Sequence, residues 1–243
     1  FWICMGSGSQ RKLILSNINI CMHTRKLYTS LFLLLLFISL FFLKDHFTGA
    51  LYQDEHHYLP AAVTFSEEPI PSISLLKSYN ELNTPIPFIL GGWVIHLFGE
   101  DIQYLRLLTF AVSFMLLMIF VWGAPDRSKR FFLCLAGLLA FPNYYLCSVY
   151  YYTDIFAMFT ALAGTVAYVK SRHWLAVLFF IASVCCRQYM LAFPAAVVSY
   201  ELLVILKRSA GFNQFVNNIL SDKKWMLYVI SVLIRGPSIF IPT

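Results

Sequence analysis

Long runs of apolar residues, separated by short polar linkers, are the feature that most limits what this chain can fold into. An apolar helix of about 20 residues crosses the hydrocarbon core of a bilayer, and several of the runs approach that length. Hydrophobic residues make up 59% of the 243 residues and charged residues only 12%, which excludes a water-soluble globular domain and a disordered chain. The six cysteines show no zinc-like spacing and lie mostly in apolar runs, so a secreted disulfide scaffold is excluded too. We therefore expect an all-α, polytopic transmembrane helical protein.

We expect seven transmembrane helices, the first of which is an uncleaved signal anchor. A signal peptide cleaved after Ala50 is the alternative, but the charged stretch 44–46 interrupts the approach to that site and many apolar runs follow. Pro142 lies inside one run and predicts a kink or a helix end. The expected spans are residues 27–43, 102–123, 131–147, 150–169, 174–186, 190–206 and 225–241.

The apolar segment 85–98 is too short for a comfortable span, so we expect a re-entrant or interfacial helix there. If it does not cross, most of the 18 Lys and Arg residues lie in cytosolic segments, as the positive-inside rule requires. The net charge of +6 is thus a topology signal, and no nucleic-acid partner is expected. The expected organisation is a cytoplasmic segment at 1–26 and a transmembrane module at 27–243, with an outer loop at 44–101 and a truncated C-terminus.

Two adjacent carboxylates, Asp54 and Glu55, form the first candidate site, just past the first expected span. At a membrane surface one of them can act as a general base while its neighbour positions it or the substrate. The alternative is an acidic loop that only contacts water. A metal site that adds His56 and His57 is not expected, because four consecutive residues of a helix cannot all face one ion.

Two further polar elements fall on the same outer face under this topology. Tyr152 and Asp154 lie in a tyrosine-rich stretch, whose alternative reading is an interfacial aromatic belt with an acid at a helix start. Arg187 and Gln188 offer a fork of donors that suits a phosphate, although an arginine at a membrane boundary can simply snorkel. Two charge pairings are also expected within single segments: Arg106 with Glu100 or Asp101, and Glu201 with Lys207 or Arg208.

Six short segments follow one another along the chain in a specific order and spacing. They are Tyr52-Gln53-Asp54-Glu55 with Pro60 and Ala62, Asn83-Thr84-Pro85-Ile86-Pro87, Leu105-Arg106, Phe141-Pro142-Asn143-Tyr144-Tyr145, Tyr151-Tyr152-Thr153-Asp154 and Arg187-Gln188. In this order and spacing they resemble the GT-C glycosyltransferases that use polyprenyl-phosphate sugars. The closest resemblance is to the family that adds the terminal α-1,2-linked glucose to dolichol-linked oligosaccharide, and it runs from about residue 28 to 205. Two departures concern Tyr58, where the family has His, and Tyr189-Met190, where it has Thr-Asn after Arg-Gln.

The resemblance implies an inverting transfer of a hexose, with glucose the expected sugar, on the luminal or periplasmic face. The donor would be a polyprenyl-phosphate sugar, the acceptor a lipid-linked glycan, and no cofactor or metal is implied. The implied location is the endoplasmic reticulum membrane in a eukaryote or the plasma membrane in a bacterium. The implied catalytic residues are Asp54 as general base and Glu55 as its orienting neighbour, and the implied substrate-binding residues are His57, Arg106, Tyr152, Asp154, Arg187 and Gln188.

Two other classes of membrane protein stay open at this point: a multi-span transporter and a non-catalytic membrane subunit. A transporter needs ionisable residues along a path through the bilayer, and Arg235 alone lies clearly inside an expected span. A shared outer cavity that brings together Asp54, Asp154 and Arg187 would favour the enzyme.

Overall fold

The computed structural model describes residues 8–79, 85–124, 129–209, 212–221 and 228–229. All regular structure in these residues is helical, as the sequence predicts. The elements are α1 (Gly8–Leu43), η1 (Asp45–Phe47), α2 (Glu55–Glu67), α3 (Ile73–Ser78), α4 (Ile86–Phe98), α5 (Ile102–Gly123), α6 (Lys129–Ala140), α7 (Pro142–Val149), α8 (Asp154–Val169), α9 (His173–Val184), η2 (Gln188–Leu191), α10 (Ala192–Arg208) and α11 (Phe212–Ser221).

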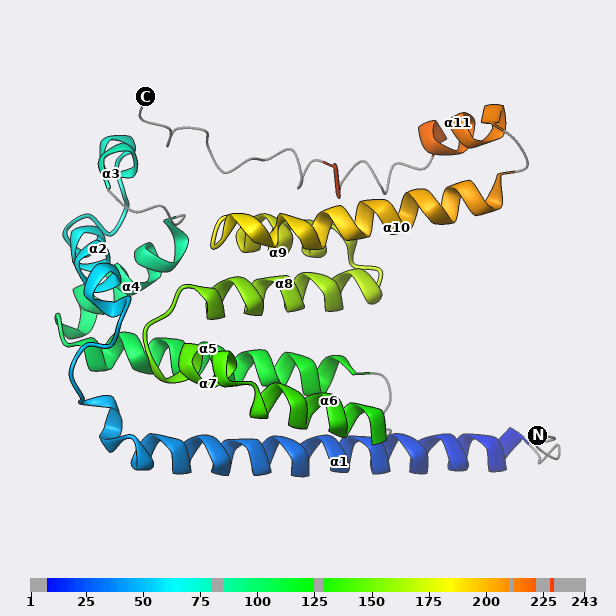
Figure 1. Cartoon of the computed structure of the whole chain (residues 1–243). Coiled ribbons are helices and arrows are strands. Elements are labelled where there is room, and N and C mark those ends of the chain that lie inside the picture. The colour runs from blue at the N-terminus through cyan, green and yellow to red at the C-terminus, as the bar shows by residue number, and fades with distance from the viewer. Residues whose placement is uncertain (1–7, 80–84, 125–128, 210–211, 222–227, 230–243) are drawn as a thin grey trace.

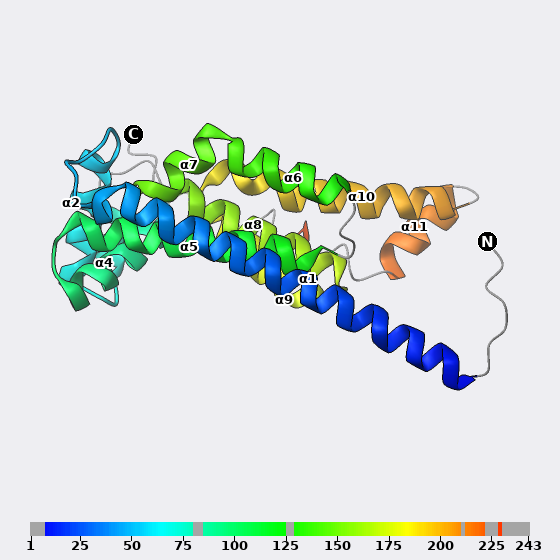
Figure 2. The ribbon, with the colours of Figure 1, turned by 90° about the horizontal axis from the view of Figure 1, so that it is seen from below.

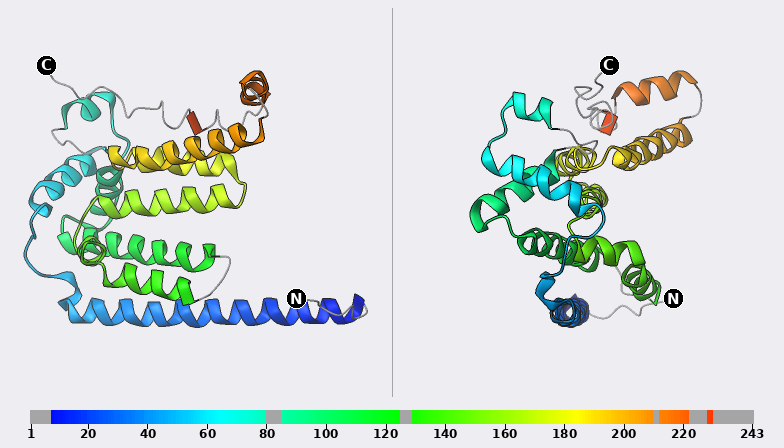
Figure 3. Two further views of the ribbon diagram at one scale, coloured as in Figure 1. Left: turned by 45° about the vertical axis from the view of Figure 1, so that its right-hand side comes forward. Right: turned by 60° about the vertical axis from the view of Figure 1, so that its left-hand side comes forward.

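The helices form a bundle with a cap at one end. Helices α1, α5, α6, α8, α9 and α10 run side by side, with α1 along one edge and α10 toward the other (Figure 1). Seen from below, α1 runs at an angle across the other helices (Figure 2), and the left view of Figure 3 shows the helices stacked side by side. The short helices α2, α3 and α4 gather at one end, which we call the cap end, and the turn between α8 and α9 lies at the opposite end.

The described part of the chain holds three helices that are long and apolar enough to cross a membrane: His23–Leu43, Ile102–Gly123 and Gln188–Arg208. A fourth span is formed if the bent pair α6 and α7 counts as one, and α8 and α9 are shorter apolar helices. An integral membrane protein is thereby confirmed, whereas the count of seven spans stays a prediction. The last expected span, 225–241, falls outside the described residues except for positions 228 and 229.

Pro142 breaks the third apolar run, as predicted. Helix α6 ends at Ala140, Phe141 takes an extended conformation, and α7 starts with Pro142 in its first turn. The two helices meet at an angle of 60°. Proline has no backbone N–H to give to the preceding turn but fits the first position of a new helix, so the chain bends here.

The short helix α4 belongs to the cap and packs against α2. It is a short apolar helix, and the expectation that segment 85–98 is re-entrant or interfacial stays a prediction. Two glycines make this contact close. A Cβ atom on Gly92 would lie 2.7 Å from the carbonyl carbon of Phe65 in α2. On the neighbouring glycine, Gly91, a Cβ atom would collide with the hydroxyl of Tyr151. The same hydroxyl donates to the carbonyl of Pro87 at 2.8 Å, so the cap is tied to the loop before α8.

The interior and the outer surface of the bundle are both apolar. Leu105 and Leu117 of α5, Ile155 of α8 and Phe88 of α4 are fully buried in one apolar core. Along α1, by contrast, most leucines and phenylalanines are exposed, and only a small part of its apolar stretch is covered by protein. In water such a surface would be unfavourable, and lipid is the solvent that suits it.

Candidate functional site

A cavity of about 420 Å³ lies at the cap end, where three distant parts of the chain meet. The loop before α2 supplies one wall, α7 and the start of α8 supply a second, and η2 supplies a third. The lining residues are Gln53, Asp54, Phe141, Asn143, Tyr144, Leu146, Cys147, Tyr152, Asp154, Met158 and Tyr189.

Asp54 lines this cavity from the residue just before α2. Its backbone carbonyl starts the helix by accepting from the amides of His57 and Tyr58, both at 2.9 Å. Its side chain makes no capping hydrogen bond and is exposed, so the carboxylate is available to a ligand in the cavity. The preceding residue, Gln53, has a φ of 42° and accepts from the hydroxyl of Tyr152 at 3.0 Å, which links this loop to the loop before α8.

Asp154 and Arg187 form an ion pair beside the same cavity. Arg187 Nη2 lies 2.7 Å from Asp154 Oδ2, and the two side chains are 17% and 25% exposed. The same nitrogen donates to the hydroxyl of Tyr58 at 3.1 Å, and the hydroxyl of Tyr189 donates to the other oxygen of Asp154. We call Arg187 and Asp154 the open pair, because both side chains are partly exposed.

Arg187 keeps its charge. Burial disfavours the charged guanidinium, but the carboxylate of Asp154 and the hydroxyl of Tyr58 more than offset that effect, so the pKa of Arg187 is raised above its usual value. Arg187 has an extended backbone between α9 and η2, which projects its side chain across to α2 and α8. A fixed cation thus stands next to a cavity that also contains Asp54.

Glu55 and Arg106 form a second pair, which is sealed from solvent. Arg106 donates from Nε and Nη2 to the two carboxylate oxygens of Glu55 at 2.9 and 2.5 Å, and the side chains are 2% and 0% exposed. The predicted pairing of Arg106 with Glu100 or Asp101 is therefore wrong. Asp101 instead caps α5 by accepting from the amide of Gln103.

The sealed pair fixes two loops that carry cavity residues. Glu55 also accepts from the amides of Tyr52 and Tyr151, each at 2.8 Å. Arg106 also donates hydrogen bonds from Nη1 and Nη2 to the backbone carbonyls of Phe47, Gly49 and Ala50. Every partner is thus internal, and neither Glu55 nor Arg106 lines the cavity. The geometry gives them a positioning part rather than contact with a ligand.

Two other candidates from the sequence lie away from the cavity lining. His57 is exposed on α2, and Gln188 is exposed at the first position of η2. Successive helical residues point about 100° apart, so neighbours of Asp54 and Arg187 need not face the same space. Tyr58 and Tyr189 contact the open pair and were not among the predicted site residues. The signal that could have found them is their place at the two departures from the family pattern.

Within the described residues, no group of three or more His, Cys, Asp or Glu side chains could hold a metal ion. The cavity is lined by an exposed carboxylate and several tyrosine side chains, and the guanidinium of Arg187 lies beside it. Such a set can accept a proton from a hydroxyl and stabilise an anion.

The chain was compared with protein families, curated proteins and solved structures. The model of the DIE2/ALG10 family matches residues 84–238, more than half of the chain. No curated protein and no solved structure matches. The matched segment contains Arg106, Tyr152, Asp154 and Arg187, whereas Asp54 precedes it.

Proposed function

The chain belongs to the DIE2/ALG10 family of membrane glycosyltransferases, which act in N-glycan precursor assembly, and on this premise we propose its donor, acceptor and mechanism. The proposed reaction moves glucose from a polyprenyl-phosphate sugar to a lipid-linked oligosaccharide, at the luminal face of the endoplasmic reticulum. One observation carries the proposal: Asp54 and Asp154 line one cavity, and Arg187 is bonded to Asp154 at its edge.

Asp54 is the proposed general base. Its carboxylate takes the proton of the acceptor hydroxyl as that oxygen attacks C1 of the sugar from the side opposite the phosphate. The C1–O bond breaks, its electron pair leaves with the polyprenyl phosphate, and the configuration at C1 is inverted. The carboxylate of Asp54 is exposed and makes no hydrogen bond that caps α2, so it is free to accept a proton, which supports this role.

Arg187 is the proposed partner of the donor phosphate. A guanidinium presents planar donors that match phosphate oxygens, and its charge stabilises the negative charge that grows on the leaving group. Asp154 and Tyr58 accept hydrogen bonds from the guanidinium and hold it beside the cavity, and Tyr189 in turn donates to Asp154. Tyr152 donates to Gln53 on the opposite wall. We propose that Asp154 and Tyr152 contact the sugar, with Gln188 and His57 reaching substrate parts outside the cavity.

Glu55 and Arg106 act in this proposal through the backbone. They hold the loop that carries Asp54 and the loop that carries Tyr152, so the two cavity walls keep a constant separation. They are positioning residues, because no atom of either faces the cavity.

The test is sugar transfer by membranes that contain the full chain. We expect transfer of labelled glucose from dolichyl-phosphate glucose to a lipid-linked oligosaccharide, and little transfer from a nucleotide sugar. Asp54→Asn keeps the size of the side chain but removes the base, so transfer falls by about 10² or more. Glu67→Gln, at an exposed acid on the same helix, is the matched control and keeps full transfer. Retained transfer by Asp54→Asn at normal expression would refute the mechanism.

A further inference from the structure

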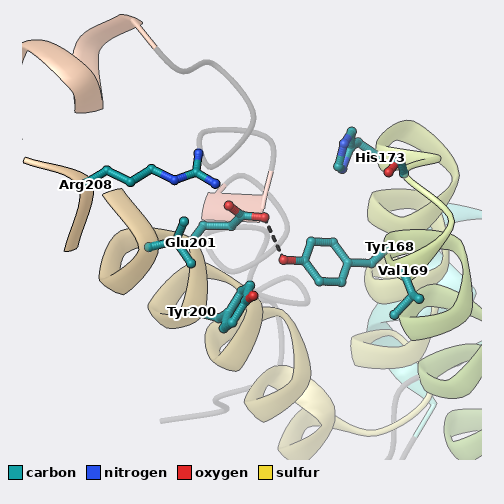
Figure 4. Close-up of a pocket in the computed structure, with 8 residues that line it drawn as sticks. Tyr168, Val169, His173, Tyr200, Glu201 and Arg208 are labelled. Atoms are coloured by element: carbon teal, nitrogen blue, oxygen red, sulfur yellow. Dashed lines mark hydrogen bonds between the residues drawn. The ribbon is translucent and has the colours of Figure 1, made fainter. Parts of the chain in front are cut away.

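A second cavity, of about 590 Å³, lies at the end of the bundle opposite the cap. Helix α8 connects the two: Asp154 at its first position lines the cap-end cavity, and Tyr168 near its last position lines the second. A helix of 16 residues is about 24 Å long, comparable with the hydrocarbon core of a bilayer. The second cavity is lined by Tyr168, Val169, Ser171, His173, Tyr200, Glu201, Val204 and Arg208 (Figure 4).

The cavity lining includes a glutamate, Glu201, and an arginine, Arg208, that do not form an ion pair with each other. Glu201 and Arg208 are seven residues apart on α10, so they share a face of the helix about two turns apart. Among the described residues, neither Glu201 nor Arg208 takes part in an ion pair. Glu201 instead accepts a hydrogen bond from the hydroxyl of Tyr168 at 2.6 Å. The predicted pairing of Glu201 with Lys207 or Arg208 is therefore wrong. Figure 4 shows Arg208 reaching over the same open space that Glu201 faces.

Aromatic rings surround the acid. Tyr168 projects from α8 toward Glu201, and Tyr200 lies beside it on α10 (Figure 4). His173 closes the far side from the start of α9, with its Nδ1 held 2.7 Å from the hydroxyl of Tyr228. A carboxylate beside tyrosine side chains suits an ammonium cation, because the carboxylate attracts its charge and accepts its hydrogen bonds.

The rim of the cavity is basic. Lys170 and Arg172 lie in the turn between α8 and α9, on either side of the lining residue Ser171, and both are exposed. Together with Arg208 they favour an anion at the mouth, and Glu201 favours a cation further in. A ligand that satisfies both preferences carries a phosphate next to an ammonium group.

We propose that this cavity binds the headgroup of a zwitterionic glycerophospholipid with a primary ammonium, of the phosphatidylethanolamine type. The ammonium lies at Glu201, between Tyr168 and Tyr200, and the phosphate lies at Arg208. The acyl chains run along the exposed apolar surface of α10, where Leu203 and Leu206 face outward. A lipid with only a negative headgroup would satisfy Arg208 but would place no cation at Glu201. This inference concerns a different cavity and does not depend on the proposed transfer reaction.

The experiment is native mass spectrometry of the purified full chain with phosphatidylethanolamine and phosphatidylglycerol that have the same acyl chains. The wild type should retain phosphatidylethanolamine more strongly. Glu201→Gln still accepts from Tyr168 but lacks the negative charge, so retention of phosphatidylethanolamine falls about tenfold while that of phosphatidylglycerol does not fall. Arg208→Gln weakens both lipids.

Lys207→Gln is the matched control, because it removes one exposed charge next to Arg208 and leaves the cavity lining intact. Monodisperse elution and an unchanged unfolding temperature in detergent show that each variant is folded. Equal retention of phosphatidylethanolamine by Glu201→Gln and the wild type would overturn the proposal. An equal loss of lipid retention in Lys207→Gln and Arg208→Gln would also overturn it, since the effect would then come from net positive charge and not from the cavity.

Discussion

The two arginine–carboxylate pairs at the cap end have the same chemistry and different surroundings. The sealed pair, Arg106 with Glu55, is almost fully buried, and all its hydrogen bonds go to protein groups. The open pair, Arg187 with Asp154, is partly exposed beside a cavity, with tyrosine hydroxyls as its other partners. A charge that is satisfied on every side holds structure together, whereas a charge that borders a cavity can exchange protein partners for a ligand.

The largest effect is expected from breaking the sealed pair. Glu55→Gln leaves the buried guanidinium of Arg106 without a countercharge, and removal of one partner of a buried pair costs about 3–5 kcal/mol. We expect a lower unfolding temperature in detergent and a loss of transfer that follows the loss of folded protein. Glu67→Gln, which changes an exposed acid of the same helix, should unfold like the wild type. Unchanged stability of Glu55→Gln would contradict the structural role.

A smaller loss of stability and a specific loss of activity are expected from breaking the open pair. Arg187→Gln should unfold close to the wild type, because both partners are partly exposed. Its KM for the polyprenyl-phosphate sugar should rise about 10- to 100-fold, the effect of losing a hydrogen bond to a charged group in a cavity. Arg187→Lys keeps the charge without the fork and should recover part of the loss. A loss of stability equal to that of Glu55→Gln would show that the two pairs do not differ.

The smallest effect is expected at Tyr189. Tyr189→Phe keeps the ring and removes the hydroxyl that donates to Asp154. A single hydrogen bond at an exposed position should change transfer by about 2- to 10-fold, with no change in unfolding. Steady-state kinetics at varied donor concentration measure this, and a complete loss would mean that the hydroxyl itself takes part in the reaction.

Local features of the structure could be predicted from the sequence, because the physics that sets them is local. The apolar length of segment 102–123 predicts α5, and Pro142 predicts the bend between α6 and α7. The short length of segment 85–98 predicts a helix too short to be an ordinary span, and α4 has 13 residues. The seven-span count goes beyond these local signals and stays a prediction.

The partners of the charged residues could not be predicted, because they are distant in the sequence. Arg106 has two acids within one or two turns, yet it bonds to Glu55, 51 positions away, because the loop before α2 folds back over α5. Glu201 has two basic neighbours on its own helix, yet it bonds to Tyr168, 33 positions away on α8. Whether a charged side chain is buried or borders a cavity depends on these tertiary contacts, so the sequence could name Glu55 and Asp154 but could not show which of them is buried.

The most direct test of the central claim is to find where the donor binds. The full chain in native-like membranes is irradiated with a photoreactive dolichyl-phosphate glucose analogue, and the labelled peptides are mapped. We predict label in segments 141–154 and 187–189, around the cap-end cavity, and loss of that label in excess dolichyl-phosphate glucose. Competed label confined to the second cavity, around residues 168–173 and 200–208, would contradict the account.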